Sequence, residues 1–388
     1  MNPLAARYSR FRVAERLLLT GHSHQAWPDV AFEGQQQAWL DAAELVDRKW
    51  ARAAEVADTV RRHWARLLGD PDGAIALGAN THELVVRLLS ALLEPRGTVR
   101  ARLVTSTGEF HTIRRQFDRL AEAGVEVVKV DARPVETLAA RLAAAVDDRT
   151  AAVFVSSVLF ETSEIVPGLA ELAARVRKHG AALVVDAYHH VNVVPFDIDA
   201  LGLGDQFVVG GGYKYCQLGE GNCFLRLPPG CALRPVITGW FAEFATLKAA
   251  PRPGVVAYGE GADRFAGATY DPTAHYRARS VFTFFEDEAL TPVRLRAISE
   301  RQVALLEQAF TALDLDPARV ALPGIPAAGR AGFLALRAPE AAALADALRA
   351  RGVNTDARGE WLRFGPAPYL SDTQLEDAMA ALGEVVGR

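Results

Sequence analysis

Short apolar runs alternate with amphipathic segments through the middle of the chain. Seven runs have the length and composition of buried β-strands, and they lie at residues 74–77, 102–105, 125–130, 151–156, 181–186, 207–209 and 223–227. Segments with apolar positions three or four residues apart separate them, the clearest holding Leu84, Leu88 and Leu92 on one helix face. Strands that alternate with helices predict an α/β fold with a mostly parallel sheet flanked by helices on both faces.

The two ends of the chain have other patterns. Residues 30–68 predict helix, and residues 230–280, rich in Pro, Gly and aromatic residues, predict an irregular connection. Past residue 281 we expect a long helix, followed by the strands 332–337 and 361–364 and the helices 339–351 and 371 onward. We therefore predict an N-terminal helical segment (1–68) that packs with a smaller C-terminal α+β domain (281–388), and a large ligand-binding domain between them (69–280).

Composition excludes several classes of protein. Half of the 388 residues are hydrophobic, which argues against disorder, and the net charge of −4 argues against a dedicated nucleic-acid binder. No run of about 18 apolar residues is present, so we expect a soluble, cytoplasmic protein with no membrane partner. The three cysteines fit neither a zinc spacing nor a disulfide framework.

A lysine and an aspartate follow neighbouring predicted strands. Only five of the 43 basic residues are lysines, and Lys214 lies in a glycine-dense loop between two tyrosines. Asp186 ends an apolar strand, where a helix cap or a structural ion pair would explain it if it stood alone. Together the two residues meet the needs of pyridoxal 5'-phosphate (PLP), whose aldehyde forms a Schiff base with a lysine and whose pyridine nitrogen needs a carboxylate.

The loops after two other strands could complete a cofactor site. Asn80 and Thr81 open a helix, where free N–H groups and the helix dipole favour a phosphate; a plain N-cap is an alternative compatible with this role. Phe110 follows another strand and could cover a flat cofactor or belong to the core. The glycine pairs of the chain match neither G-x-G-x-x-G nor a P-loop, which excludes the common nucleotide sites.

Polar residues at the two ends of the chain are candidates for substrate binding. Arg363 lies between apolar residues, as an arginine that grips a carboxylate would, although the abundance of arginine leaves a structural role equally open. The pairs His22/His24 and His189/His190 lack further ligands at metal-binding spacing, so we predict no metal and assign polar or substrate roles to such residues.

The order of these segments resembles kynureninase, in the class V aminotransferase group of fold-type I PLP enzymes. The resemblance extends from Gly21-His22-Ser23 to Leu362-Arg363-Phe364-Gly365, and its most specific parts are Asp186-x-x-His189, Tyr213-Lys214-Tyr215, Gly219-x-Gly221 and Gly239-Trp240-Phe241. It implies the fold-type I PLP-dependent transferase fold, with PLP bound by the large domain, and a homodimer whose active site is shared between subunits.

The resemblance also implies a role for each matching residue. Lys214 would be the Schiff-base lysine, Asp186 would face the pyridine nitrogen, and His189 would lie near the cofactor ring. Phe110 would stack on that ring, and Arg363 would bind the substrate α-carboxylate near His22 and Ser23. The phosphate would be held by Asn80, Thr81 and Tyr213, together with Trp240 and Thr269 of the neighbouring subunit.

Two segments depart from the family pattern. Phe110-His111-Thr112-Ile113 replaces Phe-Pro-Ser/Thr-Asp, so that Ile113 stands where the family has an acid. Gly21-His22-Ser23-His24-Gln25 replaces Gly-Asn-Ser-Leu-Gly. The substrate, and the roles of His24, His111 and His190, therefore stay open.

The implied reaction is hydrolysis of the Cβ–Cγ bond of kynurenine or a related γ-keto-α-amino acid, giving alanine and an aryl acid. Lys214 would act as the base and Tyr213 as a proton relay. A class V aminotransferase acting on a small amino acid would share Lys214, Asp186 and Arg363, and a non-catalytic binding module is a further alternative. Cysteine desulfuration is disfavoured, because it needs a thiolate far downstream of the lysine and the last cysteine, Cys231, is only 17 residues past it.

Overall fold

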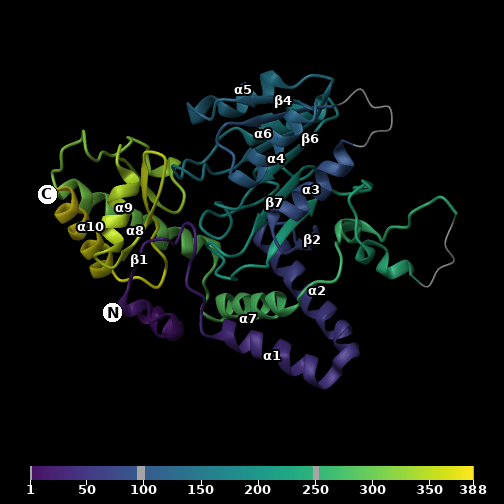
Figure 1. The fold of residues 1–388 in the computed structure, drawn as a ribbon, viewed down its shortest axis with the longest axis horizontal. Coiled ribbons are helices and arrows are strands. Elements are labelled where there is room, and N and C mark those ends of the chain that lie inside the picture. The colour runs from purple at the N-terminus through teal and green to yellow at the C-terminus, as the bar shows by residue number, and fades with distance from the viewer. Residues whose placement is uncertain (1, 94–100, 248–252, 388) are drawn as a thin grey trace.

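A seven-stranded sheet forms the centre of the protein. The computed structural model describes residues 2–93, 101–247 and 253–387. The strand order is β2-β8-β7-β6-β5-β3-β4 (Figure 1), and β8 runs antiparallel to β2 and β7, which flank it. The predicted mostly parallel sheet is confirmed, with strands β2 (Ala74–Gly78), β3 (Arg102–Ser106), β4 (Glu126–Val130), β5 (Thr150–Ser156), β6 (Ala182–Asp186), β7 (Phe207–Gly211) and β8 (Cys223–Leu227).

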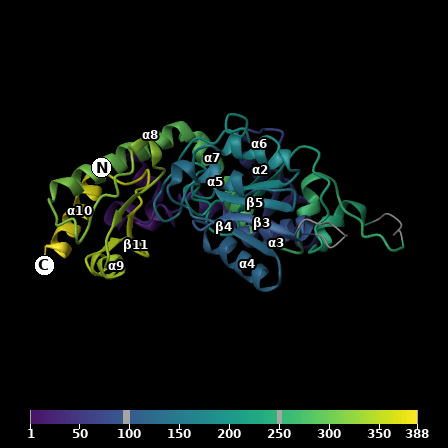
Figure 2. The ribbon, with the colours of Figure 1, turned by 90° about the horizontal axis from the view of Figure 1, so that it is seen from above.

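Helices cover both faces of this sheet. One face carries α3 (Thr81–Leu92) and α4 (His111–Glu122), and the other carries α5 (Leu138–Ala145) and α6 (Leu169–Lys178) (Figure 2). Alternation along β5 explains the two layers, because Phe154 packs with Phe117 of α4 while Val153 belongs to the core with α5 and α6. Helix α5 was not predicted, since its short Ala- and Leu-rich sequence has no polar face to show a period.

The predicted helical segment at residues 30–68 is two helices, α1 (Val30–Leu45) and α2 (Lys49–Leu67). The chain turns between them through a short 3-10 helix, η3 (Val46–Arg48), whose first residue has a φ of 52°. Both helices pack along α7 (Thr273–Asp287), so the boundary predicted at residue 280 falls inside a helix.

Residues 2–20 contact the C-terminal part of the chain instead. After a 3-10 helix, η1 (Pro3–Phe11), strand β1 (Leu17–Leu18) pairs in parallel with β10 (Val353–Asn354). The Asn2 side chain donates hydrogen bonds to the carbonyls of Pro368 and Leu370. Both termini therefore lie on the same side of the molecule (Figure 1).

The C-terminal part contains a second, antiparallel sheet in the order β11-β12-β9. Its strands are β9 (Leu334–Arg337), β11 (Asp356–Arg358) and β12 (Trp361–Phe364), and the helices α8 (Pro292–Ala312), α9 (Ala341–Arg349) and α10 (Asp372–Val386) pack around it. Ser371 begins α10 with a capping box to Gln374. The predicted strands 332–337 and 361–364 and helices 339–351 and 371 onward are confirmed as β9, β12, α9 and α10. The single long helix expected past residue 281 is instead the end of α7 followed by α8, and β11 was not predicted.

Within the predicted irregular connection, the described residues 230–247 and 253–280 are more regular than predicted. They form two 3-10 helices, η5 (Trp240–Thr246) and η6 (Gly261–Phe265), and the first turns of α7. None of the helices within the described ranges combines the length and the apolar character needed to cross a membrane.

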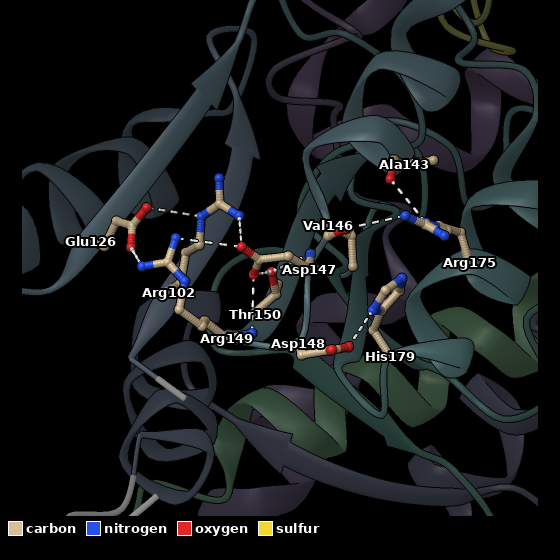
Figure 3. Close-up of polar contacts among 10 residues, drawn as sticks. All are labelled: Arg102, Glu126, Ala143, Val146, Asp147, Asp148, Arg149, Thr150, Arg175 and His179. Carbon is tan, nitrogen blue, oxygen red and sulfur yellow. Dashed lines mark hydrogen bonds and ion pairs between the residues drawn. The ribbon is translucent and has the colours of Figure 1, made fainter. Parts of the chain in front are cut away.

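Ion pairs hold together the amino ends of the central strands. The loops predicted to carry the site begin at the opposite, carboxyl ends of these strands. Arg102 pairs with Glu126 and with Asp147, and Arg149 joins both carboxylates (Figure 3). Most of these groups are largely exposed, so each pair adds only a little to stability. The two ends of the central strands are chemically different: the amino ends carry a network of paired charges, and the carboxyl ends border a cavity.

Candidate active site

A cavity of about 220 Å³ lies at the carboxyl ends of β5, β6 and β7. In a parallel sheet this edge is where loops from neighbouring strands meet and ligands bind. Predicted site residues that line it are Asn80, Thr81, Phe110, Asp186, His189, Tyr213 and Lys214. The wall also contains Ala79, Thr112, Ser156, Val158, Phe160, Tyr188, Glu220, Gly221 and Cys223.

Lys214 is buried at the centre of this constellation. Its Nζ lies 2.6 Å from Nε2 of His189 and 4.5, 5.3 and 5.7 Å from the ring centroids of Tyr188, Phe110 and Tyr213. Burial lowers the pKa of Lys214 to about 7, although the Asp186 carboxylate opposes the shift. A lysine amine that is neutral near pH 7 is a nucleophile and a base.

Asp186 presents one carboxylate oxygen to the cavity. Its Oδ1 accepts the backbone N–H of Tyr188 at 2.8 Å, whereas Oδ2 has no hydrogen-bond partner among the described residues. Burial raises the pKa of Asp186, and the Tyr188 N–H and the Lys214 ammonium oppose that shift. His189 is uncharged because burial, with Lys214 and Arg363 nearby, lowers its pKa well below the ordinary value, and its buried Nδ1 has no partner in the described structure.

The amino end of α3 forms another wall. Asn80 caps the helix, its Oδ1 accepting the N–H of Glu83 at 2.9 Å, so the cap alternative is present in the structure. First-turn N–H groups of a helix have no partner within the helix and favour an anion. Tyr213 lines the same cavity, and the His24 ring stacks on it at 5.0 Å. This wall suits a phosphate.

The predicted substrate-binding residues lie behind the cavity wall rather than in it. Arg363 is buried, and its Nη1 donates to the carbonyl of Phe160, which does line the cavity. Its Nε and Nη2 donate to Asp356, which also bonds His22 Nε2 at 2.8 Å. Ser23 donates its hydroxyl to the carbonyl of Thr20. The structure thus joins Arg363 to His22 through Asp356, a residue that the sequence analysis missed.

Trp240 and Thr269 are outside the cavity. The Trp240 indole donates to the Thr269 hydroxyl at 3.3 Å, and both residues are exposed. The family resemblance implies that they hold the phosphate in the site of a neighbouring subunit, and this role stays a prediction.

The segment that departs from the family pattern divides between the cavity and the core. Thr112 lines the cavity, whereas Ile113 is 1% exposed and packs in the apolar layer under the sheet with Phe117. His111 is exposed on the surface of α4, and His190 is buried beside the Ser157 hydroxyl. Ile113 thus belongs to the apolar core and does not line the cavity.

A buried acid was overlooked in the loop before Phe110. Glu109 accepts hydrogen bonds from the hydroxyls of Ser106 and Ser156 and from the Ser156 N–H, at 2.6, 2.7 and 3.1 Å. Burial raises its pKa to about 7 despite these bonds, with a further rise from Asp186. Ser156 is the register partner of Asp186. Ser156 is a polar residue at the end of an apolar strand, and this pattern in the sequence could have drawn attention to it.

The described residues contain no group of three or more His, Cys, Asp or Glu side chains placed to hold a metal ion. The polar atoms that do face the cavity fit PLP. The cavity is lined by the amine of Lys214, by the carboxylate of Asp186, which has one oxygen without a partner among the described residues, and by the amino end of α3. The Phe110 ring supplies an apolar surface.

Comparisons with known proteins support the fold and relate the C-terminal part of the chain to one family. A family model described as the kynureninase C-terminal domain matches residues 295–382, which include Arg363. None of the curated proteins matches the chain.

Solved structures match over nearly the whole length. A mutant of C-DES with glycine covalently linked to its PLP cofactor has a TM-score of 0.83 and 17% identity, and the match covers 98% of this chain and 99% of that one. Cysteine desulfurase from Thermococcus onnurineus NA1 gives 0.80 and 16%, covering 100% and 98%. Cysteine desulfurase CsdA from Escherichia coli gives 0.78 and 16%, covering 99% and 98%.

The predicted α/β fold is therefore confirmed: this chain has the fold of PLP-dependent cysteine desulfurases, that is, fold-type I. Its C-terminal part resembles the corresponding domain of kynureninase.

Proposed function

We propose that this protein is a PLP-dependent enzyme acting on a small amino acid, and that it hydrolyses the Cβ–Cγ bond of kynurenine or a related γ-keto-α-amino acid to alanine and an aryl acid. The observation that carries the proposal is Lys214, buried with an amine that is neutral near pH 7, in one cavity with the carboxylate of Asp186. The kynureninase match over residues 295–382 favours hydrolysis among the reactions of this fold.

The cavity residues have separate roles in this proposal. When bound, the cofactor supplies an aldehyde for the amine and a ring that accepts electrons from the substrate Cα. Asp186 would keep a proton on the pyridine nitrogen, and the amino end of α3 with Tyr213 would hold the phosphate. Phe110 and His189 would contact the ring.

Proton transfer is assigned to Lys214 and Tyr213. The Lys214 Nζ, as a neutral amine, would take the proton from the substrate Cα and return it later. Hydrolysis would place the water oxygen on the γ-carbonyl carbon and a proton on Cβ as the Cβ–Cγ bond breaks. Burial raises the pKa of Tyr213 to about 12, so its hydroxyl stays protonated and could donate that proton, to be replaced by a proton from the added water. Tyr188, Phe110 and Phe160 give the cavity apolar walls.

A class V aminotransferase remains the second candidate, because it would use Lys214, Asp186 and Arg363 in the same way. Cysteine desulfuration has less support although the solved structures of that class share the fold. Cys216 and Cys223 are buried, Cys231 is half-buried, and burial raises the pKa of all three thiols. Cys223 lines the cavity, but its raised pKa keeps it a thiol rather than the thiolate that desulfuration needs.

We also propose a homodimer. Large apolar side chains are exposed together on the segment that projects beside β2 (Figure 1), at Val236, Ile237, Trp240, Phe244 and Leu247. Patches of this kind mark interfaces. Placing Trp240 and Thr269 against a partner would let them reach its site, as the family resemblance implies.

The first experiment is an absorption spectrum of the purified protein with PLP, followed by addition of kynurenine or 3-hydroxykynurenine and an assay for alanine. A visible band that is absent in Lys214→Ala, with alanine formed and no keto acid required, supports the hydrolase. The matched control is Lys178→Ala, on the surface of α6, which should keep the band.

Other outcomes assign the protein elsewhere. A band without alanine, and with amino transfer to a keto acid, favours the aminotransferase. Release of sulfide from cysteine or cystine favours the desulfurase class. No band in the wild-type protein rejects the cofactor and the proposed function with it.

A further inference from the structure

Arg363 already holds a carboxylate. Its Nε and Nη2 donate to Oδ1 and Oδ2 of Asp356 at 2.9 and 2.6 Å, the two-point geometry in which a guanidinium binds a carboxylic acid. The remaining nitrogen, Nη1, donates to the carbonyl of Phe160 at 2.6 Å. The Nε/Nη2 edge of Arg363, which presents two parallel N–H groups, is therefore occupied by a residue of the chain itself, and Nη1 at the far end of the guanidinium is bonded to the backbone.

Asp356 is held there as an anion. It also bonds Nε2 of His22 at 2.8 Å. Burial lowers the pKa of His22 to about 4, so this imidazole is neutral and donates its proton to the carboxylate. Burial alone would raise the pKa of Asp356, but the His22 hydrogen bond and the Arg363 guanidinium outweigh it and keep the pKa well below the ordinary value. Arg363 and Asp356 thus cancel each other's charge.

This cluster adjoins the cavity. The Phe333 ring contacts His22, His189 and Arg363, with centroid distances of 4.7 and 6.0 Å to the two imidazoles and 5.8 Å to the guanidinium carbon. His189 in turn bonds Lys214, and the carbonyl that anchors Arg363 belongs to the cavity wall. A ligand that reaches Arg363 from the cavity meets the Arg363–Asp356 pair, not a free cation.

Asp356 has a second cation within reach. Nη2 of Arg358 lies 4.0 Å from its Oδ2, and the Arg358 side chain is 43% exposed, with its Nη1 donating to the carbonyl of Ala357 at 2.8 Å. The two residues are on β11, an edge strand of three residues. A carboxylate displaced from Arg363 could remain paired by turning toward Arg358 and keeping the His22 bond.

We propose that Asp356 is a specificity-determining residue, which occupies the carboxylate-binding edge of Arg363 and must turn toward Arg358 before an α-carboxylate can bind. The proposal rests on the proposed function, since it concerns the substrate end of that site. Asp356 then weakens the binding of every α-amino acid and leaves the binding of an amine without a carboxylate unaffected.

The test compares L-alanine with ethylamine, which has the same amine and methyl group but no carboxylate. Dissociation constants for both are measured on the purified protein incubated with PLP, by titration calorimetry and by the change in visible absorption. In Asp356→Asn we expect L-alanine to bind about tenfold more tightly, because the charged side chain that competes with its carboxylate for Arg363 is lost. Ethylamine is expected to bind as in the wild type. The control is Asp372→Asn, which removes an exposed partner of Arg301.

Unchanged or weaker binding of L-alanine to a folded Asp356→Asn overturns the proposal, because Asp356 would then merely position Arg363. Tighter binding of both ligands overturns it as well, since the effect would not depend on the carboxylate. Arg358→Ala gives an independent test should Asp356→Asn fail to fold: L-alanine is expected to bind about threefold more weakly, as for one surface ion pair, and an unchanged constant contradicts the displacement.

Failure of the proposed function has a different signature. Without a visible band in the wild-type protein, the cofactor assignment fails, yet calorimetry still reports whether a carboxylate competes with Asp356 for Arg363.

Discussion

Lys214 Nζ and His189 Nε2 lie 2.6 Å apart, in the loops that follow two neighbouring strands. His189 is the third residue after β6, and Lys214 is the third residue after β7. The strands are parallel neighbours, with Asp186 in register with Val209. Strand β7 extends two residues beyond this pair, and the loops that follow both strands line one cavity, where the two side chains meet. With the amine as donor, the imidazole proton belongs on Nδ1.

The rate at which the cofactor attaches to Lys214 should level off near neutral pH. Only the neutral amine attacks an aldehyde, and burial lowers the pKa of Lys214 to about 7. We expect the visible band to form about tenfold faster at pH 8 than at pH 6, and little faster at pH 9. Stopped-flow absorption measures this, with free N-acetyl-lysine as the reference for the ionisation of PLP. A rate that keeps rising to pH 10 would show an ordinary lysine.

Replacing the acid at the end of β6 should separate cofactor binding from turnover. Asp186→Asn keeps the shape of the side chain and an oxygen for the Tyr188 N–H, but it loses the charge. We expect the visible band to form and turnover of the preferred amino acid to fall at least about 100-fold.

Steady-state kinetics checks this, and Asp205→Asn, which removes a surface partner of Arg177, is the control. Turnover of Asp186→Asn within a few-fold of the wild type would remove Asp186 from the mechanism.

Glu109 should make the stability of the cofactor-free protein depend on pH. Burial raises its pKa from an ordinary 4.5 to about 7, so between these values the folded state keeps a proton that the unfolded state has lost. Stability contributed at this position is therefore present below about pH 4.5 and lost as the pH rises to 7. Glu109→Gln removes the effect, and we expect it to gain up to about 3 kcal/mol relative to the wild type between pH 4.5 and pH 8.

Urea unfolding at several pH values tests the Glu109 prediction. The exposed Glu122→Gln on α4 is the control and should show no such trend. If the difference between Glu109→Gln and the wild type were the same at every pH, the titration of Glu109 would not contribute.

A methyl group at Gly365 should break the junction between the N-terminal segment and β12. The backbones approach so closely that an added Cβ would lie 2.3 Å from Nδ1 and 2.5 Å from the backbone nitrogen of His22. We expect Gly365→Ala to destabilise the protein by about 1–3 kcal/mol, as overpacking does.

The urea midpoint measures the Gly365 prediction. Gly329→Ala is the matched control, because its nearest neighbour would be 4.0 Å away. Equal midpoints for the two variants would mean that the chain relaxes around the new methyl group.

Most of the framework follows from local patterns. All seven central strands were predicted within about two residues at each end, because buried strands need continuous apolar runs and their polar ends are conspicuous. The same rule located Lys214, Asp186 and Thr81, since loops at the carboxyl edge of a parallel sheet must converge. The fold-type assignment came from resemblance rather than from the patterns.

Other features depend on contacts between distant segments, which no local pattern shows. Asp356 lies on a short edge strand with an ordinary sequence, and only pairing with β12 and the approach of His22 from the other end of the chain make it the partner of Arg363. Glu109 is unremarkable until Ser106 and Ser156 enclose it. The break at Val46 was missed because α1 and α2 share one helical period, while packing along α7 requires the chain to turn.

The sequence by itself determined the alternation of strands and helices, the parallel sheet and the edge at which the chemistry gathers, because these follow from which residues avoid water and at what spacing. Tertiary structure decided which charges face each other. Free energies of buried ions depend on partners a few ångströms away, and in this protein those partners, Lys214 with His189 and Arg363 with Asp356 and His22, come together only when the chain has folded.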